Sequence, residues 1–270
     1  MNGGKGMHCM KRDYDVVVVQ RRVIAPQHVE LIVESPDLAS AQPGQFAHVL
    51  TPGMLRRPIS FSRIDRAHGQ VGLIVQSVGI GTEWLCNRQA GDRLNVLGPL
   101  GRGFSPPEAG QPWALVGGGV GIPPLYAALQ AWQNTVHVPQ VVVILGARAA
   151  AYLIMADDFG RLGVEVRTAT DDGSAGQHGT VLSAVTEWMG VHREGQMMAC
   201  GPTAMLQAVY QVTANWSGRT QLALEQRMGC GIGACLACVV ATRSPGTHGS
   251  QYQRVCTEGP VFDREELVFS

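Results

Sequence analysis

The sequence predicts a multidomain β and α/β protein: an N-terminal antiparallel β-barrel, a doubly wound parallel sheet, and a small C-terminal cysteine-rich domain. Up to residue 104 the chain consists of short β-type runs separated by turn residues, a spacing typical of an antiparallel barrel or sandwich. The middle of the chain alternates strand-like and helix-like segments, which favours a parallel sheet. Four of the seven cysteines follow in the last part of the chain. We expect domains at residues 11–104, 112–218 and 219–270.

Composition limits what the chain can bind. Lys plus Arg and Asp plus Glu both number 21 in the 270 residues, so no excess of positive charge indicates nucleic acid or an anionic membrane surface. No run approaches the roughly 20 apolar residues of a membrane span, and the N-terminus lacks the apolar segment of a signal peptide. An odd number of cysteines fits a reducing compartment. We therefore expect a soluble cytoplasmic protein, with ordinary free thiols at Cys9, Cys86 and Cys200.

The first domain is predicted from its β-type runs and the turns between them. The runs cover residues 15–20, 28–34, 45–50, 71–78 and 92–97. Pro43-Gly44 and Ala90-Gly91-Asp92 are turn signals between such runs. The segment 97–112, dense in Gly and Pro, is where we place the boundary with the second domain.

Two motifs inside the first domain predict a flavin dinucleotide. Arg57-Pro58-Ile59-Ser60 offers a cation for a pyrophosphate, an apolar contact, and a hydroxyl able to hydrogen-bond a ring nitrogen. Gly81-Thr82, before a helix-like stretch, would present backbone N–H groups and a hydroxyl to a phosphate. Each motif alone can also be explained without a ligand: Arg57-Pro58 as the start of a strand, and Gly81-Thr82 as a turn. Together they predict FAD lying across the barrel.

A glycine run predicts a second nucleotide site in the middle domain. The strand-like segment 113–116 is followed by Gly117, Gly118, Gly119 and Gly121, and a helix is predicted over 122–132. Cys200-Gly201-Pro202 ends a neighbouring strand and would lie at the same carboxyl edge of the sheet, where ligands bind in such folds. Turn glycines with no ligand are the alternative interpretation.

The choice between NAD and NADP depends on two further features. Asp171-Asp172-Gly173 follows a predicted strand and could contact a ribose hydroxyl, which favours NAD. The same three residues also fit a solvated turn. Arg148 could instead reach a 2′-phosphate. The sequence favours NAD and leaves NADP open.

The cysteines of the last domain predict a [2Fe–2S] cluster. Cys230, Cys235 and Cys238 are spaced C-x4-C-x2-C, the plant-type ferredoxin ligand run, and Cys256 supplies a fourth thiol. The loop needs residues with small side chains and access to positive φ, which we assign to Gly229, Gly231, Gly233, Ala234 and Ala237. The alternative is a structural zinc site in a binding module without redox turnover. Zinc sites usually show two short-spaced pairs, whereas here three thiols share one loop.

In this order, the motifs resemble those of the ferredoxin-reductase superfamily, and more closely the electron-transfer subunits of NAD-linked, class 1B dihydroorotate dehydrogenase. The tail Cys256-Thr-Glu-Gly-Pro-Val-Phe262 is also similar to the ending of those subunits. The resemblance implies further FAD contacts by Ile74, Val75 and Gln76. It implies an oxidoreductase component that carries electrons from a separate FMN-binding barrel subunit, which oxidises dihydroorotate in pyrimidine (UMP) biosynthesis, through the cluster and FAD to NAD. Two subunits of each kind would form a heterotetramer.

This sequence departs from relatives in three places. Many ferredoxin reductases carry an aromatic residue at the position of Ile59, whereas the dihydroorotate branch also has isoleucine there. Gln76 stands where Arg or Lys is common. The interval between Cys238 and Cys256 looks longer than usual and is expected to be an exposed flap. We expect no acid–base or nucleophilic residue in this chain. A reductase subunit of a sulfhydrogenase, hydrogenase or ferredoxin-dependent transhydrogenase is the alternative function.

Overall fold

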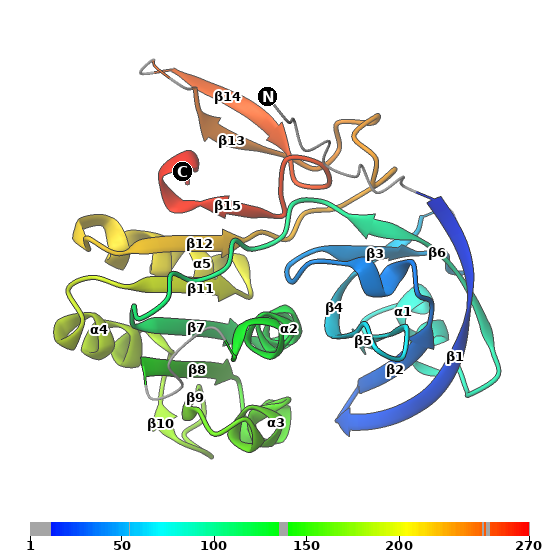
Figure 1. The fold of residues 1–270 in the computed structure, drawn as a ribbon, viewed down its shortest axis with the longest axis horizontal. Helices are drawn as coiled ribbons and strands as arrows, with labels where there is room; N and C mark the ends of the chain where they lie inside the picture. The colour runs from blue at the N-terminus through cyan, green and yellow to red at the C-terminus, as the bar shows by residue number, and fades with distance from the viewer. Residues whose placement is uncertain (1–11, 54, 135–139, 245, 247–248, 270) are drawn as a thin grey trace.

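A computed structural model describes residues 12–53, 55–134, 140–244, 246 and 249–269 of the chain. Figure 1 shows a β-barrel beside a helix-covered sheet, with a small hairpin of the C-terminal part above them. Cys9, expected to be a free thiol, lies outside the described residues. Among the described residues, no helix is long and apolar enough to cross a membrane.

The barrel is closed and antiparallel, with strand order β1-β2-β5-β4-β3-β6. Its strands are β1 (Arg12–Ala25), β2 (His28–Glu34), β3 (Phe46–Val49), β4 (Arg57–Asp65), β5 (Gln70–Gln76) and β6 (Arg93–Leu100). The five predicted runs are confirmed, and β4, which carries the Arg-Pro-Ile-Ser motif, completes the closure. Leu31, Phe61 and Leu73 fill the interior at no more than 1% exposure. Closure removes the free sheet edges.

The second sheet is doubly wound, with strand order β10-β9-β8-β7-β11-β12-β15. Its strands are β7 (Trp113–Gly118), β8 (Val141–Ala147), β9 (Glu165–Thr170), β10 (Gln177–His178), β11 (Gln196–Cys200), β12 (Arg219–Ala223) and β15 (Val261–Asp263). All neighbours are parallel except β12 and β15. The segment 219–270, expected as a third domain, therefore contributes two strands to the sheet of the second.

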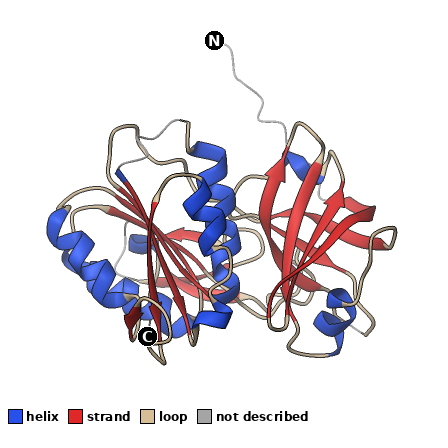
Figure 2. Cartoon of the chain, turned by 90° about the horizontal axis from the view of Figure 1, so that it is seen from below, coloured by secondary structure: helices blue, strands red, loops and turns tan. Residues whose placement is uncertain are grey.

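Helices cover both faces of this sheet (Figure 2). They are α2 (Ile122–Trp132), α3 (Ala156–Arg161), α4 (Leu182–Val191) and α5 (Thr203–Val212), while α1 (Ile80–Cys86) belongs to the barrel. Along β7, Trp113 and Leu115 pack with α2 and α3, whereas Ala114 and Val116 pack with α4 and α5. This alternation follows from the period of two in a strand. Because both faces are buried, the strands are apolar throughout.

The remaining C-terminal residues form a loop and a hairpin. Residues 224–238, which we call the cluster loop, contain no helix or strand. They lead into β13 (Val239–Arg243), which pairs with β14 (Ser250–Arg254) in a two-stranded antiparallel sheet. The interval between Cys238 and Cys256, expected to be an exposed flap, forms this hairpin in its described part, and all residues of the two strands except Thr242 are exposed or partly exposed.

One polar cluster joins the barrel to the second sheet. Arg63 of β4 donates to Glu30 (2.9 Å), to Asp158 (2.8 Å) and to the hydroxyl of Tyr126 (3.1 Å). Glu30 is 2% exposed and pairs also with Arg22. Burial alone would lower the pKa of Arg63, but the charge of Glu30 and the hydrogen bonds to Asp158 and Glu30 raise it above its usual value. We call Arg63, Glu30, Asp158 and Tyr126 the interdomain latch.

Candidate functional site

The first candidate site lies where the two predicted flavin motifs meet. A Cβ atom placed on Gly81 would lie 3.0 Å from Nε of Arg57 and 2.7 Å from Oγ1 of Thr51. The Arg57 guanidinium therefore lies against the start of α1. Its Nη1 donates to the carbonyl of Leu55 at 2.8 Å, which orients it. The hydroxyl of Thr82 is already engaged, since it accepts from the N–H groups of Val78 (2.9 Å) and Gly79 (3.1 Å).

The other predicted flavin residues divide between two faces of their strands. Ile59 and Val75 pack in the barrel interior, whereas Ile74 packs with the core of the second sheet. Pro58, Ser60 and Gln76 are partly exposed. Contact of the Ile59 and Val75 side chains with the flavin ring stays a prediction. Ile74 lies at the boundary between the barrel and the second sheet, where a shared ligand would bind.

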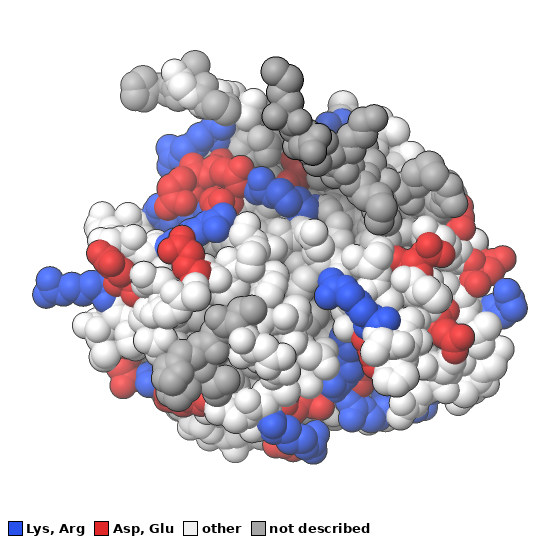
Figure 3. Space-filling view, viewed as in Figure 1, with Lys and Arg blue, Asp and Glu red and all other residues white. Residues whose placement is uncertain are grey.

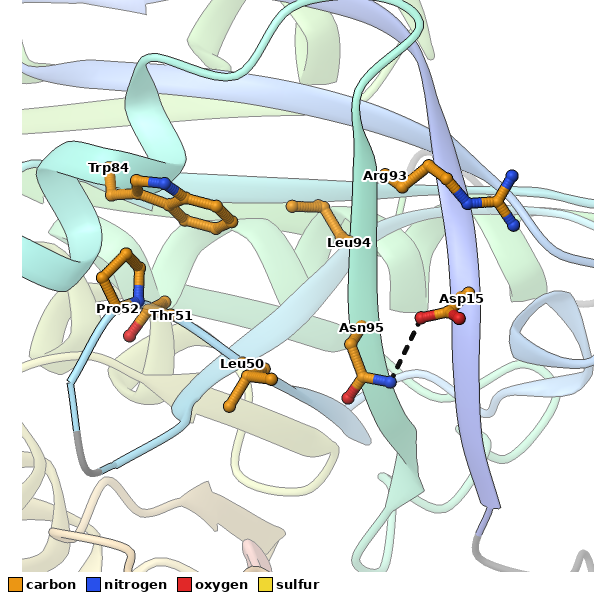
Figure 4. A pocket seen from close by; sticks show the side chains of 8 residues that line it. All are labelled: Asp15, Leu50, Thr51, Pro52, Trp84, Arg93, Leu94 and Asn95. Atoms are coloured by element: carbon orange, nitrogen blue, oxygen red, sulfur yellow. Dashed lines mark hydrogen bonds between the residues drawn. The ribbon is translucent and has the colours of Figure 1, made fainter.

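An open pocket on the barrel adjoins this site and was not predicted (Figure 4). It has a volume of about 410 Å³. Its lining residues are Asp15, Leu50, Thr51, Pro52, Trp84, Arg93, Leu94 and Asn95. Thr51 belongs both to this pocket and to the contact at Gly81, so the two spaces are neighbours. The sequence signal for the pocket is Trp84, a partly exposed aromatic residue on the helix that follows the phosphate motif.

The glycine run and the Cys-Gly-Pro turn are brought together as predicted. Cys200 lies beside Gly117 in the register of parallel strands β11 and β7. A Cβ on Gly121 would collide with the backbone of Cys200 and Gly201, so only glycine fits there. Gly119 has φ +51° and nothing within 4 Å of the position of a Cβ. Gly121 therefore has a packing role, and Gly119 leaves the space that a nucleotide would need.

Cys200 is a poor nucleophile in this position. Burial, followed by the negative charge of Glu225, raises the pKa of its thiol to about 12. Burial likewise raises the pKa of Cys86, whose Sγ lies 3.6 Å from the carbonyl of Val75. Because both pKa values are raised, the thiols of Cys86 and Cys200 are protonated at neutral pH.

The acidic pair after β9 has two different environments. The carboxylate of Asp172 accepts from the N–H (2.9 Å) and the hydroxyl (2.6 Å) of Ser174, and these bonds lower its pKa. Asp172 therefore stabilises the turn, and Asp171 is the better candidate for a ribose contact. The guanidinium of Arg148 lies 4.0 Å from the ring centre of Tyr152, in a cation–π contact.

The four predicted cluster cysteines form two pairs. Cys230 interacts with Cys235, and Cys256 interacts with Cys238 and, through its charge, with Cys230. Sγ of Cys230 also accepts from the N–H groups of Ala234 (3.3 Å) and Cys235 (3.4 Å). Burial raises the pKa of Cys230, but the hydrogen bonds from the loop outweigh burial and lower this pKa to about 6. Two thiol pairs with inward N–H groups fit a two-iron cluster, in which each iron takes two thiolates.

The backbone of the cluster loop differs from the expectation in one respect. Positive φ occurs at Gly231 (+71°), Gly233 (+88°) and Leu236 (+58°), and not at Gly229, Ala234 or Ala237. Arg254 holds the loop from the other side, because its Nη1 donates to the carbonyl of Gly233 at 3.2 Å. The carboxylate of Glu258 accepts from Arg254, and this bond lowers the pKa of Glu258 to about 2.

A histidine of the barrel contacts the cluster loop, and sequence reasoning missed it. His48 of β3 is 0% exposed, and neither of its ring nitrogens has a hydrogen-bond partner. A Cβ on Gly231 would lie 2.5 Å from its Nδ1. Burial, and then the charge of Arg56, lower the pKa of His48 to about 4. A His-Val pair inside a strand gives no local signal, so only the fold could reveal this contact.

Two domain families and full-length relatives match this chain. Residues 225–268 match the family described as the iron–sulfur cluster binding domain of dihydroorotate dehydrogenase B, and residues 115–211 match the oxidoreductase NAD-binding domain. The "Dihydroorotate dehydrogenase B (NAD(+)), electron transfer subunit" of Desulforamulus reducens is 37% identical over 96% of this chain and 100% of its own. That of Geobacillus thermodenitrificans is 40% identical over 94% of this chain and 97% of its own.

The solved structure of an NADH-dependent reduced ferredoxin-NADP oxidoreductase, studied for flavin-based electron bifurcation, is similar in fold. It is 28% identical, with a TM-score of 0.79, over 94% of this chain and 89% of that one. The similarity extends over the barrel, the second sheet and the C-terminal segment together.

Proposed function

The chain belongs to the family of dihydroorotate dehydrogenase B (NAD(+)) electron transfer subunits, and from this membership we propose that it accepts electrons from an FMN-binding barrel subunit that oxidises dihydroorotate. It is an oxidoreductase component with a [2Fe–2S] cluster, FAD and NAD as its redox groups. The observation that best supports the proposal is the contact between the cluster loop and the barrel. His48 touches Gly231 and is paired in the sheet with Pro58 of the flavin motif.

The cofactors supply the change between one-electron and two-electron transfer, since a cluster exchanges single electrons and a flavin exchanges either single electrons or a hydride. The residues of the chain bind and orient these groups. Arg57 and the backbone at Gly81 would hold the pyrophosphate of FAD through charge-assisted hydrogen bonds. The pocket beside Thr51 would take the adenosine part, with Trp84 as its apolar wall (Figure 4).

The nucleotide site is assigned to the carboxyl edge of the second sheet. Gly119 leaves room for the NAD pyrophosphate beside the start of α2, and Cys200-Gly201-Pro202 forms the facing wall. Asp171 would accept the ribose hydroxyls, which favours NAD over NADP. Cys230, Cys235, Cys238 and Cys256 would ligate the two irons.

The partner subunit is proposed to dock at the cluster loop. Ile232 and Leu236 of this loop are 48% and 61% exposed, and Cys235 is exposed between them. Exposed apolar side chains around a redox group suit a protein partner. On the face drawn in Figure 3, basic side chains gather in a run between the two lobes, with acidic side chains beside them. We propose two catalytic and two electron-transfer subunits in the assembly.

The direct test is reconstitution of the complete reaction. The chain, loaded anaerobically with FAD and cluster, is mixed with the FMN barrel subunit, dihydroorotate and NAD⁺, and NADH is followed at its absorption band. NADH formation that requires both proteins supports the proposal. Failure with dihydroorotate, together with NADH-driven reduction of a ferredoxin, would favour the reductase of another complex. NADP⁺ in place of NAD⁺ tests the role of Asp171.

A further inference from the structure

His48 is a buried side chain with no partner for its polar atoms. Among the described residues, buried side-chain nitrogen or oxygen atoms without a hydrogen bond occur in His48, Trp113, Gln130 and Thr220. His48 contributes two such atoms, both nitrogens of its ring. An imidazole has at least one N–H donor in every protonation state. A donor buried without an acceptor is unfavourable, and native proteins rarely leave one unsatisfied.

The position of the ring connects the barrel with the cluster loop. Strand β3 pairs with β4 on one side and with β6 on the other, and His48 lies opposite Pro58. Its Nδ1 lies against Gly231, so that any side chain at this position would collide with the ring. Cys230, a predicted ligand, immediately precedes Gly231 in the loop. Leu100 of β6 also lies against Gly231.

Among the described residues, the groups that act on the ring include no carboxylate. The charged groups that act on the ring are Arg56 and Arg57, which are both cations. The backbone carbonyls of Arg56 and Cys230 lie near enough to the ring to raise its pKa, but neither has the geometry of a hydrogen bond to a ring nitrogen. Arg56 donates to the backbone carbonyl of His48 at 3.1 Å and is paired with Asp13 at 2.9 Å. Leu100 and Gly231 carry no side-chain acceptor. Because the carbonyl of Cys230 is one of the backbone groups beside the ring, the ring faces the Cys230 end of the cluster loop, where a cluster sulfur would be a better placed acceptor.

We propose that an N–H group of His48 donates a hydrogen bond to a sulfur atom on the Cys230 side of the bound cluster, either the thiolate or a bridging sulfide. The inference rests on the proposed cluster site and deepens it. His48 is then a positioning residue that the barrel, not the cluster loop, supplies. Hydrogen bonds to the sulfurs help set the reduction potential of such clusters, and a donor favours the more negative, reduced state. His48 therefore raises the potential of the cluster beside the flavin motif.

The first experiment uses the unmodified protein. The chain is labelled with ¹⁵N-histidine, loaded with cluster, reduced, and examined by pulsed EPR for hyperfine coupling between ¹⁵N and the cluster spin. A coupling that disappears in His48→Phe supports the hydrogen bond. A loaded cluster with no ¹⁵N-histidine coupling overturns it. A chain that binds neither iron nor sulfide would instead overturn the proposed function, so the two failures are distinguishable.

The second experiment measures the cluster potential in variants. For His48→Phe we expect the ratio of oxidised to reduced cluster at a fixed potential to rise about tenfold, which is about 59 mV toward negative values for one electron. His48→Asn keeps an amide near Nδ1, and His48→Gln keeps one near Nε2, so the variant that restores the potential identifies the donor. Thr220→Val removes another buried, unpartnered polar atom and serves as the control, with an unchanged potential.

Two results would contradict the inference. A wild-type potential in His48→Phe would show that the ring has only a packing role. A potential that neither amide variant restores, in proteins with full iron and FAD content, would show that the N–H group is not the cause. If His48→Phe fails to assemble the cluster, the ¹⁵N hyperfine coupling in the labelled wild-type protein still tests the hydrogen bond.

Discussion

The flavin and nucleotide sites on one side, and the cluster loop on the other, are built in different ways. Arg57, Gly81 and Gly119 lie on or beside strands and helices whose backbone hydrogen bonds exist without any ligand. The cluster loop has no helix or strand and adopts positive φ at three residues. Its described contacts with the rest of the chain include His48 from the barrel and Arg254 from β14.

This difference indicates where the folding free energy of each site comes from. A site on rigid elements is preorganised, and its ligand adds affinity without ordering the chain. A loop with thiolate ligands gains most of its order from the metal itself. We therefore expect changes at the cluster to disorder the loop and leave the flavin site intact, and changes at the flavin site to leave the loop intact.

The largest effect is expected from removing one cluster ligand. Cys235→Ser should abolish [2Fe–2S] assembly, because the missing thiolate removes a strong bond that also organises the loop. Iron and sulfide per chain should fall to background, while FAD per chain stays unchanged. Hydrogen exchange should increase over residues 224–238 and not over the barrel. Cys86→Ser, at a buried thiol of α1, is the control that keeps its iron.

Loss of FAD together with iron in Cys235→Ser would contradict the expectation that the flavin site is ordered independently of the cluster loop. It would show that the barrel site depends on the loop, and that the two regions fold as one unit.

The next prediction distinguishes two costs of placing alanine at a glycine with positive φ: the backbone strain alone, and the strain together with a clash against His48. Gly231 and Gly246 both have φ +71°, but only Gly231 has neighbours within 4 Å of a Cβ, among them Nδ1 of His48. Gly246→Ala should cost the strain of positive φ alone, roughly 1–2 kcal/mol. Gly231→Ala should add the displacement of His48, about 1–3 kcal/mol for overpacking. Iron content after mild chelation should fall much further for Gly231→Ala.

Equal chelation resistance in the two alanine variants would contradict this expectation. It would mean that the loop can move away from the barrel at little cost, and that the contact with His48 does not support the cluster.

On the preorganised side, Arg57→Ala should weaken FAD binding. The lost charge-assisted hydrogen bond is worth about 1.5–3 kcal/mol, or roughly 10- to 150-fold in the dissociation constant. The neighbouring Arg56 has the same charge but pairs with Asp13 and donates to Asn95 at 2.6 Å. Arg56→Ala should therefore leave the affinity for FAD close to that of the wild type. Flavin fluorescence during dilution measures the FAD affinity of both variants. Equal affinities would show that Arg57 does not bind FAD.

The nucleotide site is tested in the same way with two glycines. Gly119 (φ +51°) and Gly110 (φ +80°) both have open space around a Cβ position, so valine costs strain at either. Only Gly119 lies at the carboxyl edge of the sheet. Gly119→Val should raise the KM for NADH about tenfold or more, because its side chain fills the space of the pyrophosphate, with FAD and iron retained. Gly110→Val should leave KM unchanged in assays with an artificial acceptor.

Local signals explain which features could be predicted from the sequence. The four cysteines, the glycine run and the Arg-Pro-Ile-Ser motif each depend on spacing within a few residues, and the structure brings Arg57 to Gly81 and Cys200 to Gly117. The turn-punctuated runs predicted the barrel, because alternating burial leaves a pattern of period two. Strand β4 (Arg57–Asp65) was not among the predicted runs, because it begins with Arg-Pro and proline cannot donate a hydrogen bond to a neighbouring strand.

The features that could not be predicted depend on contacts between distant segments. β15 joins the second sheet only because residues 261–263 reach the free edge of β12, and no pattern in three residues specifies that. The contact of His48 with Gly231 and the latch between Arg63 and Asp158 likewise join residues far apart in the sequence. The positive φ of Leu236 has no residue signal at all.

The prediction with the smallest expected effect concerns the interdomain latch, which joins the barrel to the second sheet. Arg63 bridges the barrel residue Glu30 and Asp158 of α3, whereas Arg161 pairs with Asp158 at the surface, at 3.4 Å and 71% side-chain exposure. Arg63→Met keeps the apolar stem and the packing on Tyr126 but releases both carboxylates. Because Arg22 still balances Glu30, we expect the fold, FAD and iron to be retained.

What Arg63→Met should change is the placement of the two sheets relative to each other. Reduction of bound FAD by NADH should slow about threefold to tenfold, because small displacements of reacting groups are costly, while the dissociation constant of FAD stays constant. Stopped-flow absorbance measures the rate. Arg161→Met should have the wild-type rate, since exposed pairs contribute little. A wild-type rate in Arg63→Met would show that the packing of α2 on β4 alone sets the geometry between flavin and nucleotide.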